Sequence, residues 1–458
     1  MTEHEYTSIE PMTGEVIATY ARHEAPDIEA RLSAADEAWK RWRRVAIEDR
    51  AALLLRLADE LDTAQEDLAL LATSEMGKPL AQSRAEVAKC ALACRHYAAS
   101  GPEYLGVDVV STEADRSYVR YDPIGPVLAI MPWNFPYWQV VRMLAPAILA
   151  GNVLLLKAAP STMGTGEALV EVASRAGLPD GVVQTLRVDP AQIEGVIADD
   201  RVSAVTFTGS TGGGRAVAAL AGAQGKRTVL ELGGSDPFVV LEDADVGRAA
   251  TAAVGSRIMN AGQSCVSAKR FIVHRAVADA FTEAMAEGIA AAIVGDPRDS
   301  TTDVGPLARE DIRQQLVDQV DRSLEAGALP VVRGGALDGP GFFYAPTLLA
   351  GVDKRHAVGS EETFGPVGAI LVADDDAALL ELANDTEYGL GGAVWTGDLE
   401  RGERFVAGLD VGVASINDMV KSDPRLPFGG VKASGYGREL GAHGIREFVN
   451  VKSVWAMR

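Results

Sequence analysis

The stretch VLLLKAAPSTMGTGEALVEVASRA, residues 153–176, decides the fold class of this chain. It opens with four consecutive apolar residues, Val153–Leu156, a pattern typical of a strand that is covered on both faces. A helical stretch, Gly164–Ala176, follows. Alternation of strand and helix predicts a parallel sheet flanked by helices, an α/β fold. Similar apolar runs occur at Val127–Met131, Ala204–Phe207 and Thr228–Leu232.

Helices are expected before this region, and a second set of strands after it. Leu53, Leu54, Leu57 and Leu61 recur at helical spacing, which predicts helices within residues 27–100. We expect a domain break near Gly233-Gly234, because two glycines follow a strand there. Beyond it, helical segments at 275–294 and 308–327 fall between some of the expected strands, which are Pro237–Leu241, Arg270–His274, Gly368–Val372 and Ala393–Trp395.

Composition excludes several classes of partner. The 458 residues carry 43 basic and 64 acidic side chains, a formal net charge of −21. Such a chain is repelled by nucleic acid and by anionic lipid, so we expect neither as a partner. The acidic N-terminus predicts no signal peptide, and the most apolar run, Met143–Leu156, is too short and interrupted to span a membrane. Three cysteines form no disulfide framework, so we expect a cytoplasmic protein.

Cys265 is the candidate nucleophile. A lone cysteine is more often an inert core residue, but here a glycine and polar residues precede it in Asn260-Ala-Gly-Gln-Ser-Cys265. They indicate a turn at which a substrate could reach the thiol. Cys90 and Cys94 lie four residues apart in a helical stretch and are interpreted as core residues. No second pair and no histidine cluster accompanies them, so we predict no metal site.

Glu231 is the candidate general base, since no histidine has a recognisable nucleophile-base context. It stands between Leu230 and Leu232 at the end of an apolar strand. Burial there would raise its pKa toward neutrality, which suits a base. The alternative is a glutamate at a strand end that points to solvent.

Two further motifs follow strands. The glycine-rich segment 207–214 indicates phosphate binding at the start of the helix 215–223, although it lacks the GxGxxG dinucleotide fingerprint. The segment Pro132-Trp-Asn-Phe-Pro136 fixes the backbone with two prolines and offers the Asn134 amide to an oxyanion. The alternative for this second motif is an ordinary rigid turn.

In chain order, these segments resemble the NAD(P)-dependent aldehyde dehydrogenase superfamily nearly from end to end. Glu231 and Cys265 are separated by 265 − 231 = 34 positions, as in the family. The motifs that carry the resemblance are Glu75-Met-Gly-Lys-Pro79, Pro132–Pro136, Lys157, Phe207–Thr211, Glu231–Gly234, Gly262–Cys265, Glu362–Val367 and Pro427–Gly430, with Lys432, Ser434 and Gly435.

The resemblance implies a catalytic set. Cys265 would be the nucleophile, and Glu231 the base that activates the deacylating water and accepts the thiol proton. The side-chain amide of Asn134 and the backbone N–H of Cys265 would hold the oxyanion. Attack on an aldehyde would give a thiohemiacetal, then a thioester that water hydrolyses, so that one difficult step becomes two easier ones.

The resemblance also implies a dinucleotide cofactor. Lys157 would hold the adenosine ribose, Ser210 the pyrophosphate and Glu362 the nicotinamide ribose. NAD-preferring relatives often carry a glutamate where this chain has Pro160, so a 2′-phosphate would meet no like charge, and we expect NADP, with NAD possible. The implied binding positions are Trp133, Asn134, Lys157, Ala158, Pro160, Ser161, Gly209, Ser210, Leu232, Glu362 and Phe364.

Two segments resemble the short form of succinate-semialdehyde dehydrogenases. Arg142, eight residues beyond Asn134, and Ser422 in the loop 420–427 would grip the distal carboxylate of the substrate. The alternative for Arg142 is a structural ion pair. Other open possibilities are glutarate semialdehyde, a neutral aliphatic aldehyde, and a catalytically silent relative.

Domain organisation follows mainly from the resemblance. It implies a Rossmann-like cofactor-binding domain in residues 1–105 and 124–233, and a catalytic domain in residues 234–436. Residues 106–123 and 447–458 would form a small antiparallel projection. Because the free edge of such a projection needs a partner, we expect a homodimer or a homotetramer.

Overall fold

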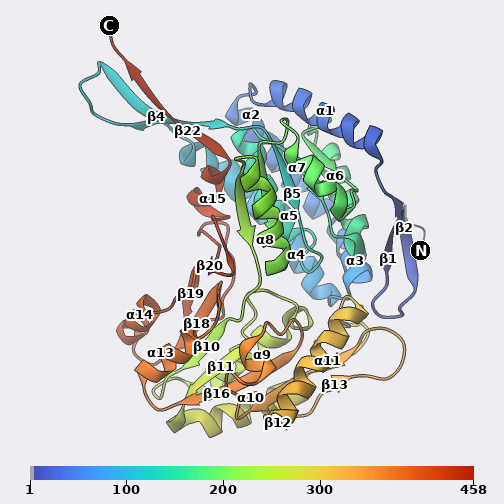
Figure 1. The fold of residues 1–458 in the computed structure, drawn as a ribbon, viewed down its shortest axis with the longest axis vertical. Coiled ribbons are helices and arrows are strands. Elements are labelled where there is room, and N and C mark those ends of the chain that lie inside the picture. Colours follow the sequence, from blue (N-terminus) through green and yellow to red (C-terminus); the bar gives the residue numbers. More distant parts are fainter. Residues whose placement is uncertain (1–4) are drawn as a thin grey trace.

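The computed structural model describes residues 5–458, which form two sheet-and-helix halves and a projecting arm (Figure 1). Residues 1–4 are part of the predicted cofactor-binding domain and of the acidic N-terminus for which no signal peptide is predicted. Those predictions fall outside the described residues at these four positions. Within residues 5–458, no helix combines the length and the apolar character that crossing a membrane requires.

The upper half in Figure 1 contains a six-stranded sheet in the order β21-β9-β8-β5-β6-β7. All neighbours except β21 and β9 are parallel, which confirms the parallel sheet predicted from the apolar runs. The strands are β5 (Pro126–Ile130), β6 (Val153–Lys157), β7 (Val183–Thr185), β8 (Ala204–Thr208), β9 (Arg227–Glu231) and β21 (Gly435–Tyr436).

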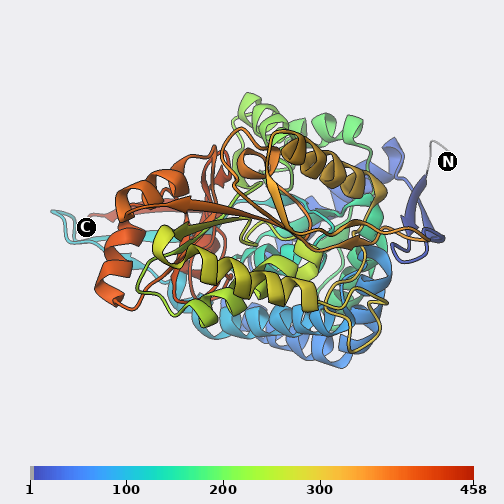
Figure 2. The ribbon, with the colours of Figure 1, turned by 90° about the horizontal axis from the view of Figure 1, so that it is seen from below.

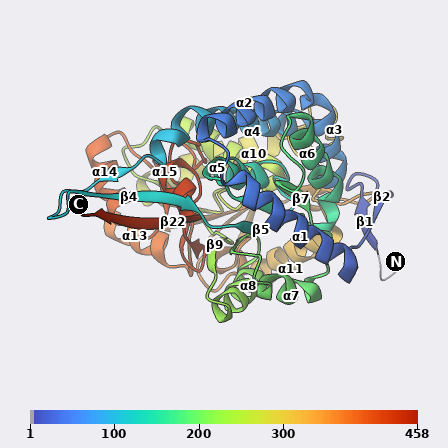
Figure 3. The same ribbon diagram turned by 90° about the horizontal axis from the view of Figure 1, so that it is seen from above.

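Helices cover both faces of this sheet. In Figure 3, α2 and α4 lie on one side of it and α8 on the other. The segment predicted as helical from residue 27 to 100 is divided into four helices, one break being at Gly77 (φ +80°). The helices are α1 (Ala25–Trp42), α2 (Ile47–Thr63), α3 (Gln65–Met76), α4 (Leu80–Tyr104), α5 (Trp138–Ala150), α6 (Met163–Arg175), α7 (Ile193–Ala198) and α8 (Thr211–Ala223).

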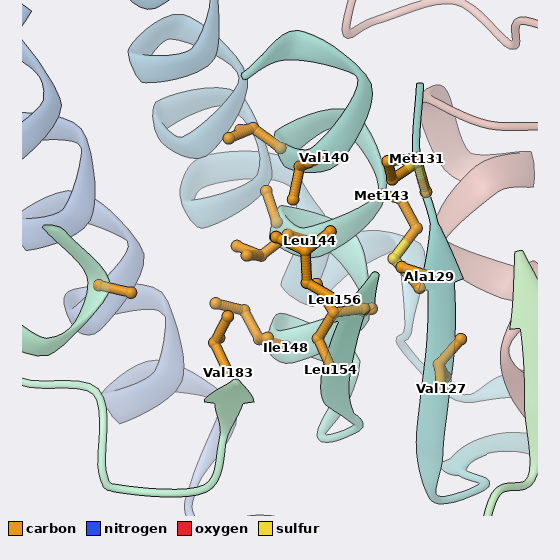
Figure 4. Close-up of a cluster of buried hydrophobic side chains, with 14 of the residues drawn as sticks. Val127, Ala129, Met131, Val140, Met143, Leu144, Ile148, Leu154, Leu156 and Val183 are labelled. Carbon is orange, nitrogen blue, oxygen red and sulfur yellow. The ribbon is translucent and has the colours of Figure 1, made fainter. Parts of the chain in front are cut away.

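The core of this half lies between α5 and the strands β5 and β6 (Figure 4). Every residue of α5 is buried, because α2 and α4 pack on the face that the sheet leaves free. Most of its side chains are apolar for this reason, and its two polar ones, Gln139 and Arg142, line cavities. Rigid packing of this kind fixes the end of β5, where the Asn134 motif begins.

The lower half contains a seven-stranded sheet in the order β12-β15-β16-β11-β10-β18-β19. Only β12 is antiparallel to its neighbour. The strands are β10 (Pro237–Val240), β11 (Arg270–His274), β12 (Leu329–Val332), β15 (Thr347–Ala350), β16 (Val367–Ala373), β18 (Gly391–Trp395) and β19 (Val413–Ile416).

This second sheet is also buried on both faces. Phe238 and Val240 face a core built with helices α9 (Val246–Ile258) and α10 (Ala278–Ala291). Val239, between them, faces a different core, built with α11 (Glu310–Glu325) and α13 (Asp376–Asn384). Figure 2 shows the yellow α10 and the gold α11 on opposite sides of the orange strands. The alternation follows from the two-residue period of a strand.

The arm is a three-stranded antiparallel sheet of β3 (Asp108–Val109), β4 (Arg116–Pro123) and β22 (Val449–Ala456). It confirms the predicted antiparallel projection and extends away from both halves (Figure 1). The remaining elements are β1 (Glu5–Ile9), β2 (Val16–Ala21), β13 (Gly335–Ala336), β14 (Tyr344–Ala345), α12 (Ala357–Ser360), β17 (Tyr388–Gly389), α14 (Leu399–Ala407), β20 (Val431–Lys432) and α15 (Gly441–Glu447).

The chain passes from the first sheet to the second between β9 and β10, on either side of Gly233-Gly234. The domain limits themselves stay a prediction. One strand crosses them, since β21 lies in the range predicted for the catalytic domain but pairs with β9. This pairing needs a glycine, because a Cβ at Gly435 would stand 2.0 Å from the Leu230 carbonyl oxygen.

Candidate active site

Two cavities meet at Cys265. The large cavity, about 460 Å³, is lined from both halves and includes Asn134 and Glu231. The small cavity, about 230 Å³, is lined mainly by α4, α5 and the loop after β19. Cys265 lines both. The structure therefore brings the three predicted catalytic residues to one place, at the junction of two separate binding spaces.

The loop before Cys265 adopts a backbone conformation that most side chains avoid. Asn260 and Ala261 have φ values of 53° and 51°, and Gly262 follows at 73°. Strain of this kind persists only where surrounding contacts enforce it, and it gathers at functional sites. Here the Asn260 side chain donates to the carbonyl oxygens of Asn134 at 2.8 Å and of Gln263 at 3.2 Å.

Asn134 is held against this same loop. It lies just beyond β5, and its Nδ2 donates to the Gln263 carbonyl at 3.1 Å. Its Oδ1 is buried without a hydrogen-bond partner among the described residues. A carboxamide nitrogen carries two hydrogens, so the second remains for an oxyanion beside Cys265. The rigid-turn alternative and the oxyanion interpretation are compatible, because the turn is what orients the amide.

Cys265 is half-buried where the two cavities meet, and its thiol has cations nearby. Burial raises its pKa to about 12, and the charges of Arg142 and Lys269 act in the opposite direction. The Lys269 ammonium donates to the carbonyl oxygens of Ser264, Cys265 and Ser267 at 3.3, 2.9 and 3.1 Å. It thereby fixes the backbone around the thiol. A thiol with so high a pKa needs a base to become a nucleophile.

Glu231 is buried at the end of β9, which excludes the solvent-exposed alternative. Neither carboxylate oxygen has a hydrogen-bond partner among the described residues. Burial and the negative charge of Glu439 raise the pKa of Glu231 well above its usual value. A Cβ at Gly429 would stand 2.8 Å from Glu231 Oε1, so this glycine makes room for the carboxylate.

The large cavity begins at the N-terminus of α8. Gly209 and Ser210 line it, and Ser210 caps the helix by accepting from the Gly213 amide at 3.3 Å. Free amides and the helix dipole favour an anion at this position. A Cβ at Gly213 would meet the Phe207 ring at 2.8 Å, which explains part of the glycine-rich pattern. The predicted phosphate loop thus opens a helix, as the sequence indicated.

The opposite wall of the large cavity carries Glu362. Its Oε1 accepts from the Gly234 amide at 3.0 Å, and a Cβ at Gly233 would stand 2.4 Å from its Oε2. The Lys269 ammonium is 3.9 Å from the Glu362 carboxylate. The two glycines and one lysine therefore place this carboxylate. Other predicted cofactor residues that line the cavity are Trp133, Leu232 and Phe364, with the Trp133 and Phe364 rings edge-to-face at 5.7 Å.

Four predicted cofactor residues lie elsewhere. Lys157 ends β6, and Ala158, Pro160 and Ser161 follow it, outside the lining of the large cavity. They occupy the carboxyl end of a parallel strand beside β5, the edge at which open α/β sheets bind nucleotides. Burial lowers the pKa of Lys157, and the Ser161 Oγ is buried without a hydrogen-bond partner.

The small cavity contains both predicted substrate residues, Arg142 and Ser422. Arg142 is buried on α5, forms an ion pair with the buried Glu439 and donates to Thr208 Oγ1 at 3.2 Å. The structural ion pair left open by the sequence is therefore present. Ser422 accepts a hydrogen bond of 2.7 Å from Lys89 on α4.

Sequence reasoning missed Lys89, Asn260 and Lys269 as parts of the site. Lys89 stands 333 residues from Ser422, and no local pattern joins them. Lys269 lies four residues after Cys265 and directly before an apolar strand. That position near the cysteine was the only sequence feature that could have identified it as part of the site. Asn260 stood in the quoted motif, and asparagine is among the residues that best tolerate positive φ. Within residues 5–458, no group of three or more metal-binding side chains comes together.

The fold and the site together define a class. A parallel sheet with a helix N-terminus at its carboxyl edge is typical of dinucleotide-binding oxidoreductases, and a second sheet supplies a cysteine at the junction of two cavities. The sequence profile of the aldehyde dehydrogenase family matches residues 1–454. The chain belongs to the aldehyde dehydrogenase family.

Similar proteins cover nearly the whole chain. A protein from Synechocystis described as a probable succinate-semialdehyde dehydrogenase (NADP+) is 46% identical over 448 residues, 98% of this chain and 99% of the relative. Succinate-semialdehyde dehydrogenase (NADP+) 1 of Mycobacterium tuberculosis is 45% identical, over 98% and 99%. The crystal structure of a succinic semialdehyde dehydrogenase from Streptococcus pyogenes with NADP+ superposes with a TM-score of 0.97 at 36% identity, over 99% of this chain and 100% of that one.

Proposed function

We propose that this enzyme oxidises succinate semialdehyde to succinate with NADP, through a thioester on Cys265. The observation that carries the proposal is the position of this thiol, which lines both cavities and lies beside Asn134 and Glu231 in the large one. A substrate in the small cavity and a nicotinamide in the large cavity would then meet at one sulfur atom. Intact catalytic residues argue against a silent relative.

Catalysis begins with the thiol proton. Glu231, once ionised, accepts it, and the thiolate adds to the aldehyde carbon. The oxyanion of the thiohemiacetal receives hydrogen bonds from Asn134 Nδ2 and the Cys265 backbone N–H. Oxidation requires the hydride acceptor that NADP supplies when bound. Glu231 passes its proton to solvent, then deprotonates the water that hydrolyses the thioester, so each turnover releases succinate and restores the thiol.

The residues present fit NADP. Ser161 Oγ is a buried, unpartnered polar atom at the edge where Lys157 ends β6, and it can donate to a 2′-phosphate. Pro160 places no carboxylate there to repel it. Two relatives at 45–46% identity are described as NADP-dependent. NAD would lose the contact with Ser161 but meet no clash, so weaker use of NAD is expected.

The small cavity supports an anionic substrate of modest size. Its volume is about 230 Å³, and three cationic side chains line it: Lys89, Arg142 and Lys421. In a chain of net charge −21, local cations of this kind favour an anion. Glutarate semialdehyde and neutral aliphatic aldehydes are the rival substrates.

Location and assembly belong to the same proposal. Cys90, Cys94 and Cys265 are free thiols, which suits a reducing cytoplasm. The arm exposes Trp455, Val451 and Val109, with relative exposures of 68%, 54% and 84%. Apolar residues on an unpaired sheet favour burial against a second copy, as a homodimer or homotetramer. Light scattering of the chain against a truncation that removes β22 tests the assembly.

The test of the function is the appearance of reduced nicotinamide. Wild-type enzyme is assayed with succinate semialdehyde, glutarate semialdehyde and butanal, each with NADP and with NAD. We expect the highest kcat/KM for succinate semialdehyde with NADP. The Cys265→Ala variant should show no reduction of NADP with any of the three aldehydes. A higher kcat/KM for butanal than for succinate semialdehyde would refute succinate semialdehyde as the substrate, while the enzyme would still be an aldehyde dehydrogenase.

A further inference from the structure

Lys89 is a cation of the small cavity that neither the sequence motifs nor the catalytic steps use. It extends from α4, and its ammonium donates to Ser422 Oγ at 2.7 Å. The same ammonium stands 4.3 Å from the centroid of the Trp138 ring, on α5. Contacts from two further segments therefore hold the charged end of Lys89 in the cavity wall.

The other charges of this cavity are already compensated. Arg142 pairs with Glu439, Lys421 with Asp418, and Glu86 with Lys78. For Lys89, by contrast, no ion pair with a carboxylate is found within residues 5–458. A half-buried ammonium held by a hydroxyl and an aromatic face has capacity left for an anion, because it carries three donors.

We propose that Lys89 makes a direct contact with the distal carboxylate of the substrate, beside Ser422 and Arg142 in the lining of the small cavity. This inference rests on the proposed function and adds a second cation to the predicted pair of Arg142 and Ser422. Ser422 accepts from Lys89, so its own hydrogen is free to donate to the same carboxylate. Cys265 and Lys89 line one cavity, with room for a short chain between them.

Electrostatics supports the same assignment. Burial, and to a smaller extent the charge of Arg142, lowers the pKa of Lys89 to about 8. Asp423 and Glu86 act in the opposite direction without contacting the ammonium. A bound carboxylate would offset this unfavourable burial, because a nearby opposite charge favours the charged ammonium.

The test replaces Lys89 by methionine, which keeps the stem against Trp138 and removes the charge. For Lys89→Met, we expect kcat/KM for succinate semialdehyde to fall roughly 10- to 100-fold, the effect of one charge-assisted hydrogen bond. Oxidation of butanal, the neutral four-carbon aldehyde, should stay within about 3-fold. The inhibition constant of the product succinate, measured against butanal, should rise by the same factor as the loss on the semialdehyde.

Two other lysine-to-methionine variants serve as controls for Lys89→Met. Lys40→Met removes an exposed lysine of α1 that lines neither cavity, and it should leave every ratio unchanged. Lys421→Met removes a paired cation from the small cavity. An equal loss of selectivity in Lys421→Met would overturn direct contact and indicate a general field. Unchanged selectivity in Lys89→Met would also overturn the inference. If the wild-type enzyme prefers succinate semialdehyde to butanal, that result leaves the proposed function intact. If the wild-type enzyme shows no such preference, both the role of Lys89 and the proposed function are refuted.

Discussion

Replacing Arg142 by methionine should destabilise the enzyme through the carboxylate that it leaves behind. Arg142 and Glu439 have side-chain exposures of only 2% and 3%, so the pair is desolvated. Removing one partner of a buried pair costs about 3–5 kcal/mol, because the other charge stays buried. We expect a loss of this size in the free energy of unfolding at pH 8.

The loss should depend on pH in a defined direction. Burial raises the pKa of Glu439 and Arg142 lowers it, so the substitution raises that pKa further. The native state then binds a proton that the unfolded state has released above about pH 4.5. Stability therefore falls as pH rises through the native pKa, by at most about 1.4 kcal/mol per pH unit. The penalty of Arg142→Met should be smaller at pH 6 than at pH 8.

Urea unfolding, followed by tryptophan fluorescence at one protein concentration, measures both effects. The double variant Arg142→Met/Glu439→Gln is the matched comparison, because it removes the stranded carboxylate. It should recover part of the lost stability and lose the extra pH dependence. If Arg142→Met unfolds like the wild type at both pH values and affects only selectivity for the semialdehyde, then Arg142 is a substrate ligand and the structural account of it is wrong.

Three further outcomes follow from the site. Because burial and Glu439 raise the pKa of Glu231, kcat/KM should rise with pH above the usual titration range of a carboxylate. Glu231→Gln should lower kcat by roughly 10²–10⁴ and flatten that rise. Ser161→Glu should raise KM for NADP at least roughly 10-fold and change KM for NAD little, since one unfavourable charge is added; equal changes would refute the 2′-phosphate site. Gly233→Ala should raise cofactor KM by displacing Glu362, whose Oε2 would stand 2.4 Å from the new Cβ, and unaltered kinetics would contradict that placement.

The fold was predictable where the pattern is local. Unbroken apolar runs such as Val153–Leu156 identified strands buried on both faces, and the structure places them in parallel sheets. Short or exposed strands gave no such signal. β12, for example, has the sequence LPVV and lies at a sheet edge, where exposure removes the apolar pattern.

The candidate site was likewise predictable where residues stand in local motifs, and not where distant segments meet. Cys265, Glu231 and Asn134 stand in motifs whose order in the chain is informative, and they meet around one cavity. Contacts between distant segments could not be predicted. The pairing of Arg142 with Glu439 joins α5 to the segment before α15, and no spacing in the sequence predicts this contact. The sequence offered both interpretations of Arg142, and only the folded geometry supplied its carboxylate.

The central claim is that the aldehyde becomes bound to Cys265 and that Glu231 directs its release. Wild-type enzyme, mixed with NADP and succinate semialdehyde and quenched in acid within one turnover, can be analysed by peptide mass spectrometry. The account predicts one succinyl group on the peptide that contains Cys265, formed only when NADP is present, and none on the peptide of Cys90 and Cys94. An unmodified Cys265 in enzyme that still reduces NADP would contradict it.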